Sequence, residues 1–242
     1  MGRRLGQHFL IRGAILERIA AAACPLHEPL VVEIGPGRGA LTEKLLARAD
    51  RVVAIELDVE LAEALRARLP AEIIHADVLS TDLAQWGPAV IAGNLPYYIS
   101  SPILEKVLSL PFRRAVFLLQ KEVAERLVAR PGSRSYGYLT VATALYARAR
   151  LLFEVKPAAF RPPPKVDSAV VLLEPRPPAV TDAAGFLRFA GLAFHHKRKT
   201  LRNNLLGAYE KEVVDALPEA GLRAEQLEFD RLIELYARLN RP

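Results

Sequence analysis

The stretch that most constrains the fold of this chain is an apolar run that leads into a glycine-rich turn. The run, Leu30-Val31-Val32-Glu33-Ile34, has the length and composition of a buried parallel strand, and Gly35-Pro36-Gly37-Arg38-Gly39 follows it directly. Residues 40–49 then predict a helix. A glycine-rich turn between a strand and a helix lets a ligand approach the backbone closely, because glycine has no side chain. We therefore predict an α/β fold with a ligand site at this turn.

Two later strands lead into a carboxylate. Glu56 follows the expected strand 51–55 and stands 21 residues beyond Gly35, which is the usual distance for an acid that binds ribose hydroxyls. Asp77 follows the expected strand 72–75. Because ligands of an open α/β sheet bind at the carboxyl ends of its strands, we expect both acids at the same edge as the glycine turn.

A fourth strand end carries the motif Asn94-Leu95-Pro96-Tyr97, which follows the apolar run 88–93. The motif suits chemistry on the exocyclic amine of a planar base. The Asn94 side-chain oxygen and the Leu95 carbonyl can accept the two amine hydrogens, Pro96 stiffens the turn, and Tyr97 offers a flat face for stacking. Taken alone, the same residues also fit a strand-ending turn with a buried tyrosine.

The order and spacing of these motifs resemble those of the ribosomal RNA adenine N6,N6-dimethyltransferases, which use S-adenosylmethionine (SAM). The resemblance covers nearly the whole chain and is closest to the small-subunit branch of the family. It is carried by residues 6–10, 33–42, 94–97 and 159–168. The family often has Asn where this chain has His8, so we expect the backbone to make that contact here. The resemblance implies a Rossmann-like class I methyltransferase sheet with a small C-terminal helical domain.

The resemblance also implies roles for individual residues. SAM is expected to contact His8, Leu10, Gly35, Gly37, Glu56, Asp77 and Asn94. The catalytic residues are expected to be Asn94, Leu95, Pro96, Tyr97 and Phe160, with the target adenine between Tyr97 and Phe160. Without the family, a Phe160 buried under the loop Pro162-Pro163-Pro164 would be the preferred interpretation. The implied reaction is dimethylation of two adjacent adenosines near the 3′ end of small-subunit rRNA, presented on a preribosomal small-subunit particle.

A proline-rich linker at residues 175–178 predicts a methyltransferase domain at 1–177 and a helical domain at 178–242. Helices are expected at about 183–206, 210–218 and 224–240. The first of these carries a basic segment for which we favour RNA binding over a merely solvated helix face, with Arg198 and Arg202 one turn apart. The expected RNA-binding residues are Lys197, Arg198, Lys199 and Arg202. For the polar loop 130–137, a substrate-side lip and a plain connector remain open.

Composition agrees with this interpretation. A net charge of +6 and a pI near 9.6 suit a polyanionic partner. A single cysteine, Cys24, excludes an internal disulfide framework and an iron–sulfur radical mechanism, and its apolar surroundings favour a core role over the nucleophile of cytosine C5 methylation. The histidines lack metal-ligand spacing, so we expect no metal. No apolar run reaches the ~20 residues of a membrane span. We expect a cytoplasmic monomer.

Three other functions are compatible with parts of this sequence. A large-subunit rRNA adenine dimethyltransferase of the macrolide-resistance type shares the fold, but those enzymes tend to close the Asn-Leu-Pro motif with Phe, so Tyr97 and the loop 160–164 favour the small-subunit enzyme. A nicotinamide oxidoreductase would have its third glycine one position later and has no use for residues 94–97. The third alternative is an RNA-binding assembly factor with dispensable catalysis, a role that can coexist with the enzyme.

Overall fold

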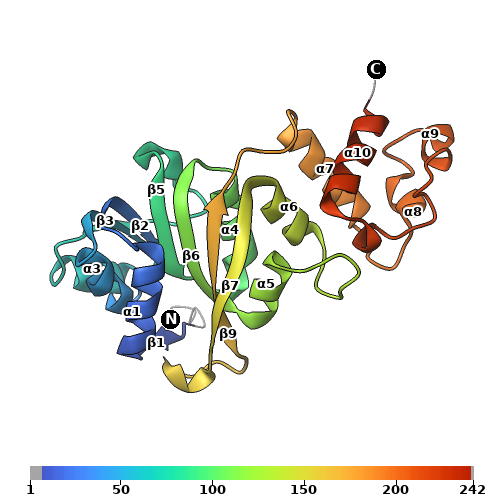
Figure 1. Cartoon of the computed structure of the whole chain (residues 1–242). Coiled ribbons are helices and arrows are strands. Elements are labelled where there is room, and N and C mark those ends of the chain that lie inside the picture. Colours follow the sequence, from blue (N-terminus) through green and yellow to red (C-terminus); the bar gives the residue numbers. More distant parts are fainter. Residues whose placement is uncertain (1–6, 241–242) are drawn as a thin grey trace. The chain divides into compact units, whose positions relative to one another are not determined.

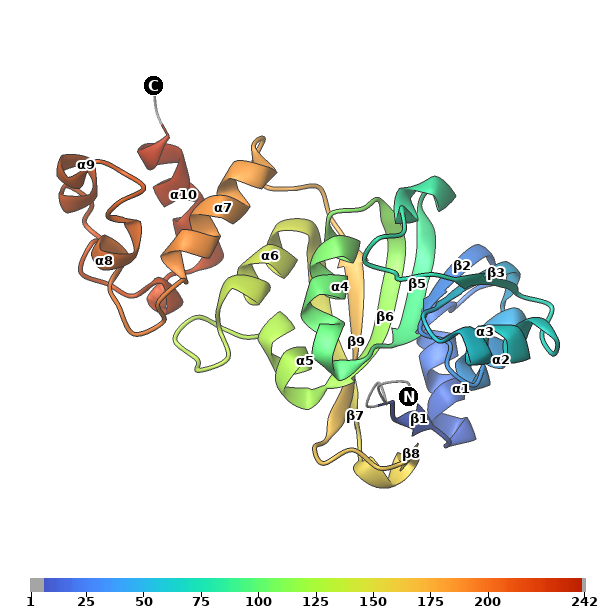
Figure 2. The same cartoon turned by 180° about the vertical axis from the view of Figure 1, so that it is seen from behind.

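The computed structural model describes residues 7–240 and divides the chain into two units, 1–124 with 148–175 and 125–147 with 176–242 (Figures 1 and 2). Gly6, with which the first motif begins, lies outside the described residues, as do residues 1 and 242, the outer bounds of the expected domains. Among residues 7–240, no helix is long and apolar enough to cross a membrane.

The first unit is built on a seven-stranded sheet with the order β4-β3-β2-β5-β6-β9-β7. The strands from β4 to β6 are parallel, and β9 is antiparallel to β6. The chain moves outward from β2 to β3 and β4 and then returns to β5 on the other side of β2, which makes the β2–β5 boundary the switch point where ligands bind. The strands are β2 (Glu28–Ile34), β3 (Ala49–Glu56), β4 (Glu72–His75), β5 (Ala89–Asn94), β6 (Phe112–Gln120), β7 (Ala147–Val155) and β9 (Ser168–Pro175).

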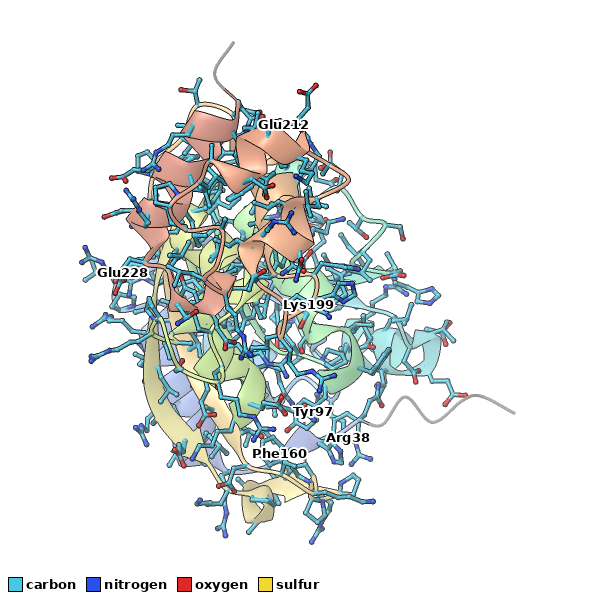
Figure 3. The ribbon with its side chains drawn as sticks, turned by 90° about the vertical axis from the view of Figure 1, so that its right-hand side faces the viewer. Arg38, Tyr97, Phe160, Lys199, Glu212 and Glu228 are labelled. Atoms are coloured by element: carbon cyan, nitrogen blue, oxygen red, sulfur yellow. The ribbon has the colours of Figure 1, made fainter. Side chains whose placement is uncertain are left out.

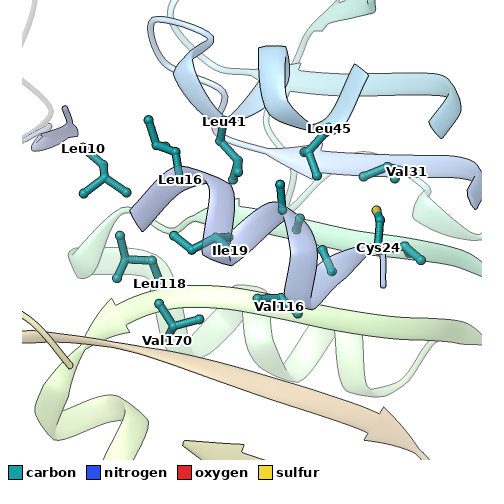
Figure 4. Packing of buried hydrophobic residues seen from close by; sticks show 14 of the residues in the cluster. Leu10, Leu16, Ile19, Cys24, Val31, Leu41, Leu45, Val116, Leu118 and Val170 are labelled. Atoms are coloured by element: carbon teal, nitrogen blue, oxygen red, sulfur yellow. The ribbon is translucent and has the colours of Figure 1, made fainter. Parts of the chain in front are cut away.

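Helices cover both faces of this sheet, with α1 and α4 on opposite faces (Figures 1 and 2). The apolar side of α1 packs between α2 and the sheet, where Leu16, Ile19 and Leu45 are buried (Figure 4). Cys24 is fully buried in the same cluster, which confirms its core role, and burial raises the pKa of its thiol to about 11. The helices are α1 (Gly13–Ala23), α2 (Ala40–Leu46), α3 (Val59–Arg66) and α4 (Ser100–Leu108). A further helix, α5 (Lys121–Leu127), contains the sequence boundary between the two units.

A small second sheet joins the N-terminal motif to the proline loop. Its strands, β1 (Phe9–Leu10) and β8 (Phe160–Arg161), are antiparallel, and Leu10 faces Phe160 while Phe9 faces Arg161. Directly opposed residues share one face of a sheet. Leu10 and Phe160 are both buried, whereas Arg161 is exposed. This pairing holds the first motif beside residues 159–162.

The second unit is helical and has its own core. Its helices are α6 (Tyr138–Tyr146), α7 (Ala183–Ala193), α8 (Leu201–Leu205), α9 (Lys211–Asp215) and α10 (Phe229–Leu239). Phe186, Phe189 and Leu235 are buried in one cluster with Tyr136 and Val141. The expected domain 1–177 therefore differs from the structure, because residues 125–147 pack with the C-terminal helices.

The expected helix 183–206 is also corrected. Helix α7 ends at Ala193, and α8 begins at Leu201. Asn204 stabilises the intervening turn, because its side-chain nitrogen donates to the carbonyls of Ala193 and His196 and its oxygen accepts the His196 N–H. Arg198 lies in this turn rather than one helical turn from Arg202. The expected helices 210–218 and 224–240 are also shorter, because α9 covers 211–215 and α10 covers 229–239.

Candidate active site

A cavity of about 330 Å³ opens at the carboxyl ends of the central strands of the first unit. A smaller cavity of about 40 Å³ adjoins it and shares Gly35, Glu56 and Pro96 with it. The larger cavity brings together the expected residues His8, Leu10, Gly35, Gly37, Glu56, Asn94, Leu95, Pro96 and Tyr97. Asp77 lines the smaller cavity with Val78 and Tyr98. The expected residues at the ends of four strands therefore meet at one edge of the sheet.

The glycine turn lines both cavities through Gly35. Gly35 has a φ of +69° and donates its N–H to the carbonyl of Ile55 at 3.0 Å, which ties the turn to β3. Gly39 has a φ of +80°, and a Cβ added there would stand 2.6 Å from the Leu65 side chain. Any other residue at Gly39 would be strained and would collide with α3. The backbone conformation of the turn therefore requires glycine at both positions.

Glu56 is buried and already engaged by the backbone. One carboxylate oxygen accepts the Gly37 N–H at 2.9 Å, and the other accepts the Asp58 N–H at 3.0 Å. Each oxygen still has lone-pair capacity for a second donor. Asp77 is exposed and accepts the Leu79 N–H at 2.8 Å. The carboxylates of Glu56 and Asp77 are thus both fixed by backbone N–H groups, and both residues line a cavity, as the sequence predicted.

The orientation of the Asn94 amide is set by the N-terminal motif. Its nitrogen donates to the backbone carbonyl of His8 at 2.9 Å. A carbonyl can only accept, so the amide oxygen must be the atom that remains for another donor. The Leu95 side chain is buried. The backbone N–H of Leu95 donates to the Leu118 carbonyl at 3.1 Å, which fixes the turn against β6.

Tyr97 is half-buried and lines the larger cavity. Figure 3 labels its position. Its hydroxyl forms a 2.6 Å hydrogen bond with the buried hydroxyl of Ser168, and burial raises the pKa of Tyr97. The ring centroids of Tyr97 and His8 are 5.6 Å apart. The His8 ring donates through Nδ1 to the Pro162 carbonyl at 2.8 Å. The tyrosine ring is therefore held in place from two sides.

Phe160, which is expected to hold the target adenine together with Tyr97, is buried in this structure. Its ring is 3 % exposed, packs in the core cluster with Leu10 and Val155, and is not among the residues that line the cavity. The β1–β8 pairing turns Phe160 inward and leaves its neighbour Arg161 on the cavity wall. In this arrangement Phe160 packs against the first motif, and its role toward the target adenine stays a prediction.

Glu33 is a cavity residue that the sequence did not single out, because it stands inside an apolar strand. It is 1 % exposed, and its Oε2 has no hydrogen-bond partner in the described part of the chain. Burial raises the pKa of Glu33 to about 8, while Thr42 opposes the rise and the negative charge of Glu56 adds to it. A carboxyl oxygen without a partner in a cavity wall fits a ligand that brings a positive charge or a donor. The sequence signal for this role is a lone carboxylate two residues before the glycine turn.

The expected RNA-binding residues all lie in the second unit. Lys197, Arg198 and Lys199 are exposed in the turn between α7 and α8 (Figure 3 labels Lys199). Arg202 lies in α8, where its guanidinium pairs with Asp215 at 2.5 Å. In the described range 7–240, no group of three or more His, Cys, Asp or Glu side chains could hold a metal ion.

The strand order, the antiparallel β9 and the glycine turn with acids at the neighbouring strand ends define a class I methyltransferase. The family model for "Ribosomal RNA adenine dimethylase" matches residues 2–239, and on this match the chain belongs to the ribosomal RNA adenine dimethylase family of SAM-dependent enzymes.

Two curated relatives carry the name "Ribosomal RNA small subunit methyltransferase A". The protein of Xanthomonas euvesicatoria pv. vesicatoria is 46% identical, with 96% of this chain and 94% of that protein covered. The protein of Chlorobium chlorochromatii is 42% identical, with 97% of this chain and 92% of that protein covered.

Solved structures agree with the fold. A dimethyladenosine transferase from Plasmodium falciparum superimposes with a TM-score of 0.81 at 27% identity, covering 94% of this chain and 96% of that one. The 23S rRNA methyltransferase ErmE superimposes with a TM-score of 0.73 at 28% identity, covering 96% of this chain and 100% of that one.

Proposed function

We propose that this enzyme uses SAM to dimethylate N6 of two adjacent adenosines near the 3′ end of small-subunit rRNA. The observation that carries the proposal is the anchored Asn94 amide, whose oxygen is left facing the cavity as an acceptor for an amine. The names of the Xanthomonas and Chlorobium relatives support a small-subunit substrate.

The cavity residues fit SAM. Bound SAM supplies an electrophilic methyl group on its sulfonium. We assign Glu56, which lines both cavities, to the ribose hydroxyls, and Asp77, which lines the smaller cavity, to the adenine amine. The orphaned Oε2 of Glu33 matches the ammonium of the methionine end, beside Gly35 and the first motif. His8 and Leu10 complete this wall through β1.

The amine site is proposed to work by positioning. The Asn94 oxygen and the Leu95 carbonyl accept the two N6 hydrogens, which aims the nitrogen lone pair at the methyl group, while Tyr97 supports the flat face of the adenine. Pro96 fixes the turn that presents them. The methylated amine loses its proton readily to water, so no general base is needed. After the first transfer, the base is held by one hydrogen bond fewer and must be accommodated again for the second.

The large-subunit alternative has weaker support. ErmE shares the fold but is 28% identical to this chain, whereas the small-subunit relatives are 42% and 46% identical. Tyr97 closes the Asn-Leu-Pro motif, which favours the small-subunit enzyme because the macrolide-resistance enzymes tend to have Phe there.

Primer extension separates the two substrates, because N6,N6-dimethyladenosine blocks base pairing and stops the polymerase. Undermethylated small subunits, large subunits and naked rRNA are each incubated with enzyme and SAM. We expect a new stop near the small-subunit 3′ end, strongest on the preribosomal particle. A stop confined to large-subunit rRNA would overturn the substrate assignment and leave the chemistry intact.

A further inference from the structure

Two polar segments of the second unit, distant in the sequence, are tied together by a lysine. The loop 130–135 precedes α6, and the turn 195–199 joins α7 to α8. The Lys197 ammonium donates to the backbone carbonyl of Arg134. The loop is also fixed from its other side, where the Gly132 N–H donates to the Glu225 carbonyl at 2.6 Å. Both segments are therefore held by hydrogen bonds within one unit.

The cations of these segments differ from Arg202 in their pairing. Arg130, Arg134, Arg198 and Lys199 are exposed, and within residues 7–240 none of them forms an ion pair with a carboxylate. Arg202, by contrast, is bonded to Asp215, which also pairs with Lys211 at 3.0 Å. A cation that already has a carboxylate partner has less to gain from a phosphate than one that is free.

We propose that the loop 130–135 and the turn 195–199 form one phosphate-binding surface for structured RNA, to which Arg130 and Arg134 belong and from which Arg202 is excluded. This proposal rests on the proposed rRNA substrate and names the residues that hold it. Arginine is suited to the role because its planar guanidinium binds phosphate through two hydrogen bonds.

The chemistry of the surface favours RNA over a membrane or an acidic protein. The exposed large apolar side chains described for the second unit are Leu192, Val213 and Leu222, and none lies in either segment. Amphipathic membrane-surface segments insert apolar residues beside their cations, and the core of a protein interface is more apolar than its rim. Cations without carboxylate partners and without such apolar neighbours suit the phosphates of structured RNA, which is recognised mainly by shape and backbone.

The test compares neutral substitutions of single arginines in the full-length protein. Binding to undermethylated small subunits is measured by filter retention over a series of KCl concentrations. Log affinity falls as log salt concentration rises. Arg130→Gln and Arg134→Gln should each make this negative slope less steep by about one unit. The control is Arg188→Gln, which removes an exposed arginine from α7. It and Arg202→Gln should leave the slope near that of the wild type.

Equal slopes for Arg134→Gln and Arg188→Gln would refute the proposed phosphate-binding surface. A larger loss of slope for Arg202→Gln than for Arg134→Gln would also refute it. A second measurement uses vesicles of phosphatidylserine and phosphatidylcholine. If the Arg130 and Arg134 variants lost vesicle binding and kept particle binding, the partner would be a membrane and the proposal would fail. SAM affinity, measured by calorimetry, should be unchanged in all variants. Failure of the proposed function itself would be visible separately, as a wild-type enzyme that leaves small-subunit rRNA unmethylated.

Discussion

The Asn94 side-chain nitrogen donates a 2.9 Å hydrogen bond to the backbone carbonyl of His8, a residue 86 positions earlier in the chain. The bond decides which end of the amide faces the cavity, because a carbonyl cannot donate. It also links the first motif, just before β1, to the motif that is proposed to hold the amine. Loss of either partner is therefore expected to disturb the acceptor geometry as well as the local packing.

The two acids at the strand ends should respond differently to substitution. Asp77→Ala removes an exposed carboxylate and should weaken SAM binding about 10- to 100-fold, as expected for a hydrogen bond to a charged group, with little change in Tm. Asp82→Ala is the matched control, because Asp82 makes the same kind of turn, accepting the Ala84 N–H at 2.9 Å, away from the cavities. Glu56→Gln should lower both SAM affinity and Tm, since the buried carboxylate accepts two backbone N–H groups. Calorimetry that finds equal SAM affinity for the Asp77 and Asp82 variants would refute the Asp77 assignment.

Tyr97 should show separable ring and hydroxyl effects. Tyr97→Ala removes the stacking face and should cost methyl transfer the equivalent of about 1–3 kcal/mol. Tyr97→Phe keeps the face but leaves the buried Ser168 hydroxyl unpaired, so it should lower the free energy of unfolding by about 1–3 kcal/mol while changing turnover less. Adding Ser168→Ala to Tyr97→Phe should recover part of that stability. Turnover as low in the Phe variant as in the Ala variant would show that the hydroxyl itself takes part.

Glu33 should make stability depend on pH. In the unfolded chain this carboxyl ionises near its ordinary pKa of 4.5, whereas burial raises the pKa to about 8 in the folded chain. Between these values folding takes up a proton, so the free energy of unfolding should fall as pH rises. Relative to Glu33→Gln, the wild type should lose about 1 kcal/mol per pH unit between pH 5.5 and 7.5 in urea denaturation. The exposed Glu63→Gln is the control, and parallel pH profiles for wild type and Glu33→Gln would contradict the argument.

Asn204 should determine the shape of the basic turn. Asn204→Ala leaves the Ala193 and His196 carbonyls and the His196 N–H without their partner, which should destabilise the protein by about 1–3 kcal/mol and flatten the salt dependence of particle binding. The adjacent Asn203 is exposed and makes no such side-chain bonds in the described structure, so Asn203→Ala should change neither quantity. Identical salt slopes for the two variants would show that the turn keeps its shape without Asn204.

Much of the fold and site follows from local sequence. The glycine turn, the spacing from Gly35 to Glu56 and the apolar strands are short-range signals, and they predicted the edge where the cavities lie. The burial of Phe160 depends on its pairing with β1, about 150 residues away, as the register of Leu10 with Phe160 shows. The break before α8 depends on the Asn204 side chain, which a helical pattern of apolar residues does not reveal.

The grouping of residues 125–147 with the C-terminal helices also depends on long-range packing. Tyr136 is buried in the second core, and its hydroxyl donates to the Leu227 carbonyl at 3.0 Å. Nothing in the polar loop before it indicates that partner. Similarly, Glu33 is recognisable as a cavity residue only once the first motif is seen to lie over the ends of β2 and β5.

The central claim is that Asn94 presents its oxygen to N6 of an adenosine in small-subunit rRNA. It is tested most directly by mass spectrometry of nucleosides from undermethylated small subunits incubated with SAM and either the wild type or Asn94→Ala. The wild type should produce N6,N6-dimethyladenosine, and the variant should produce it about 100-fold more slowly or worse while losing less SAM affinity. Near-equal rates of N6,N6-dimethyladenosine formation by the two proteins, or a product methylated elsewhere than N6, would contradict the account.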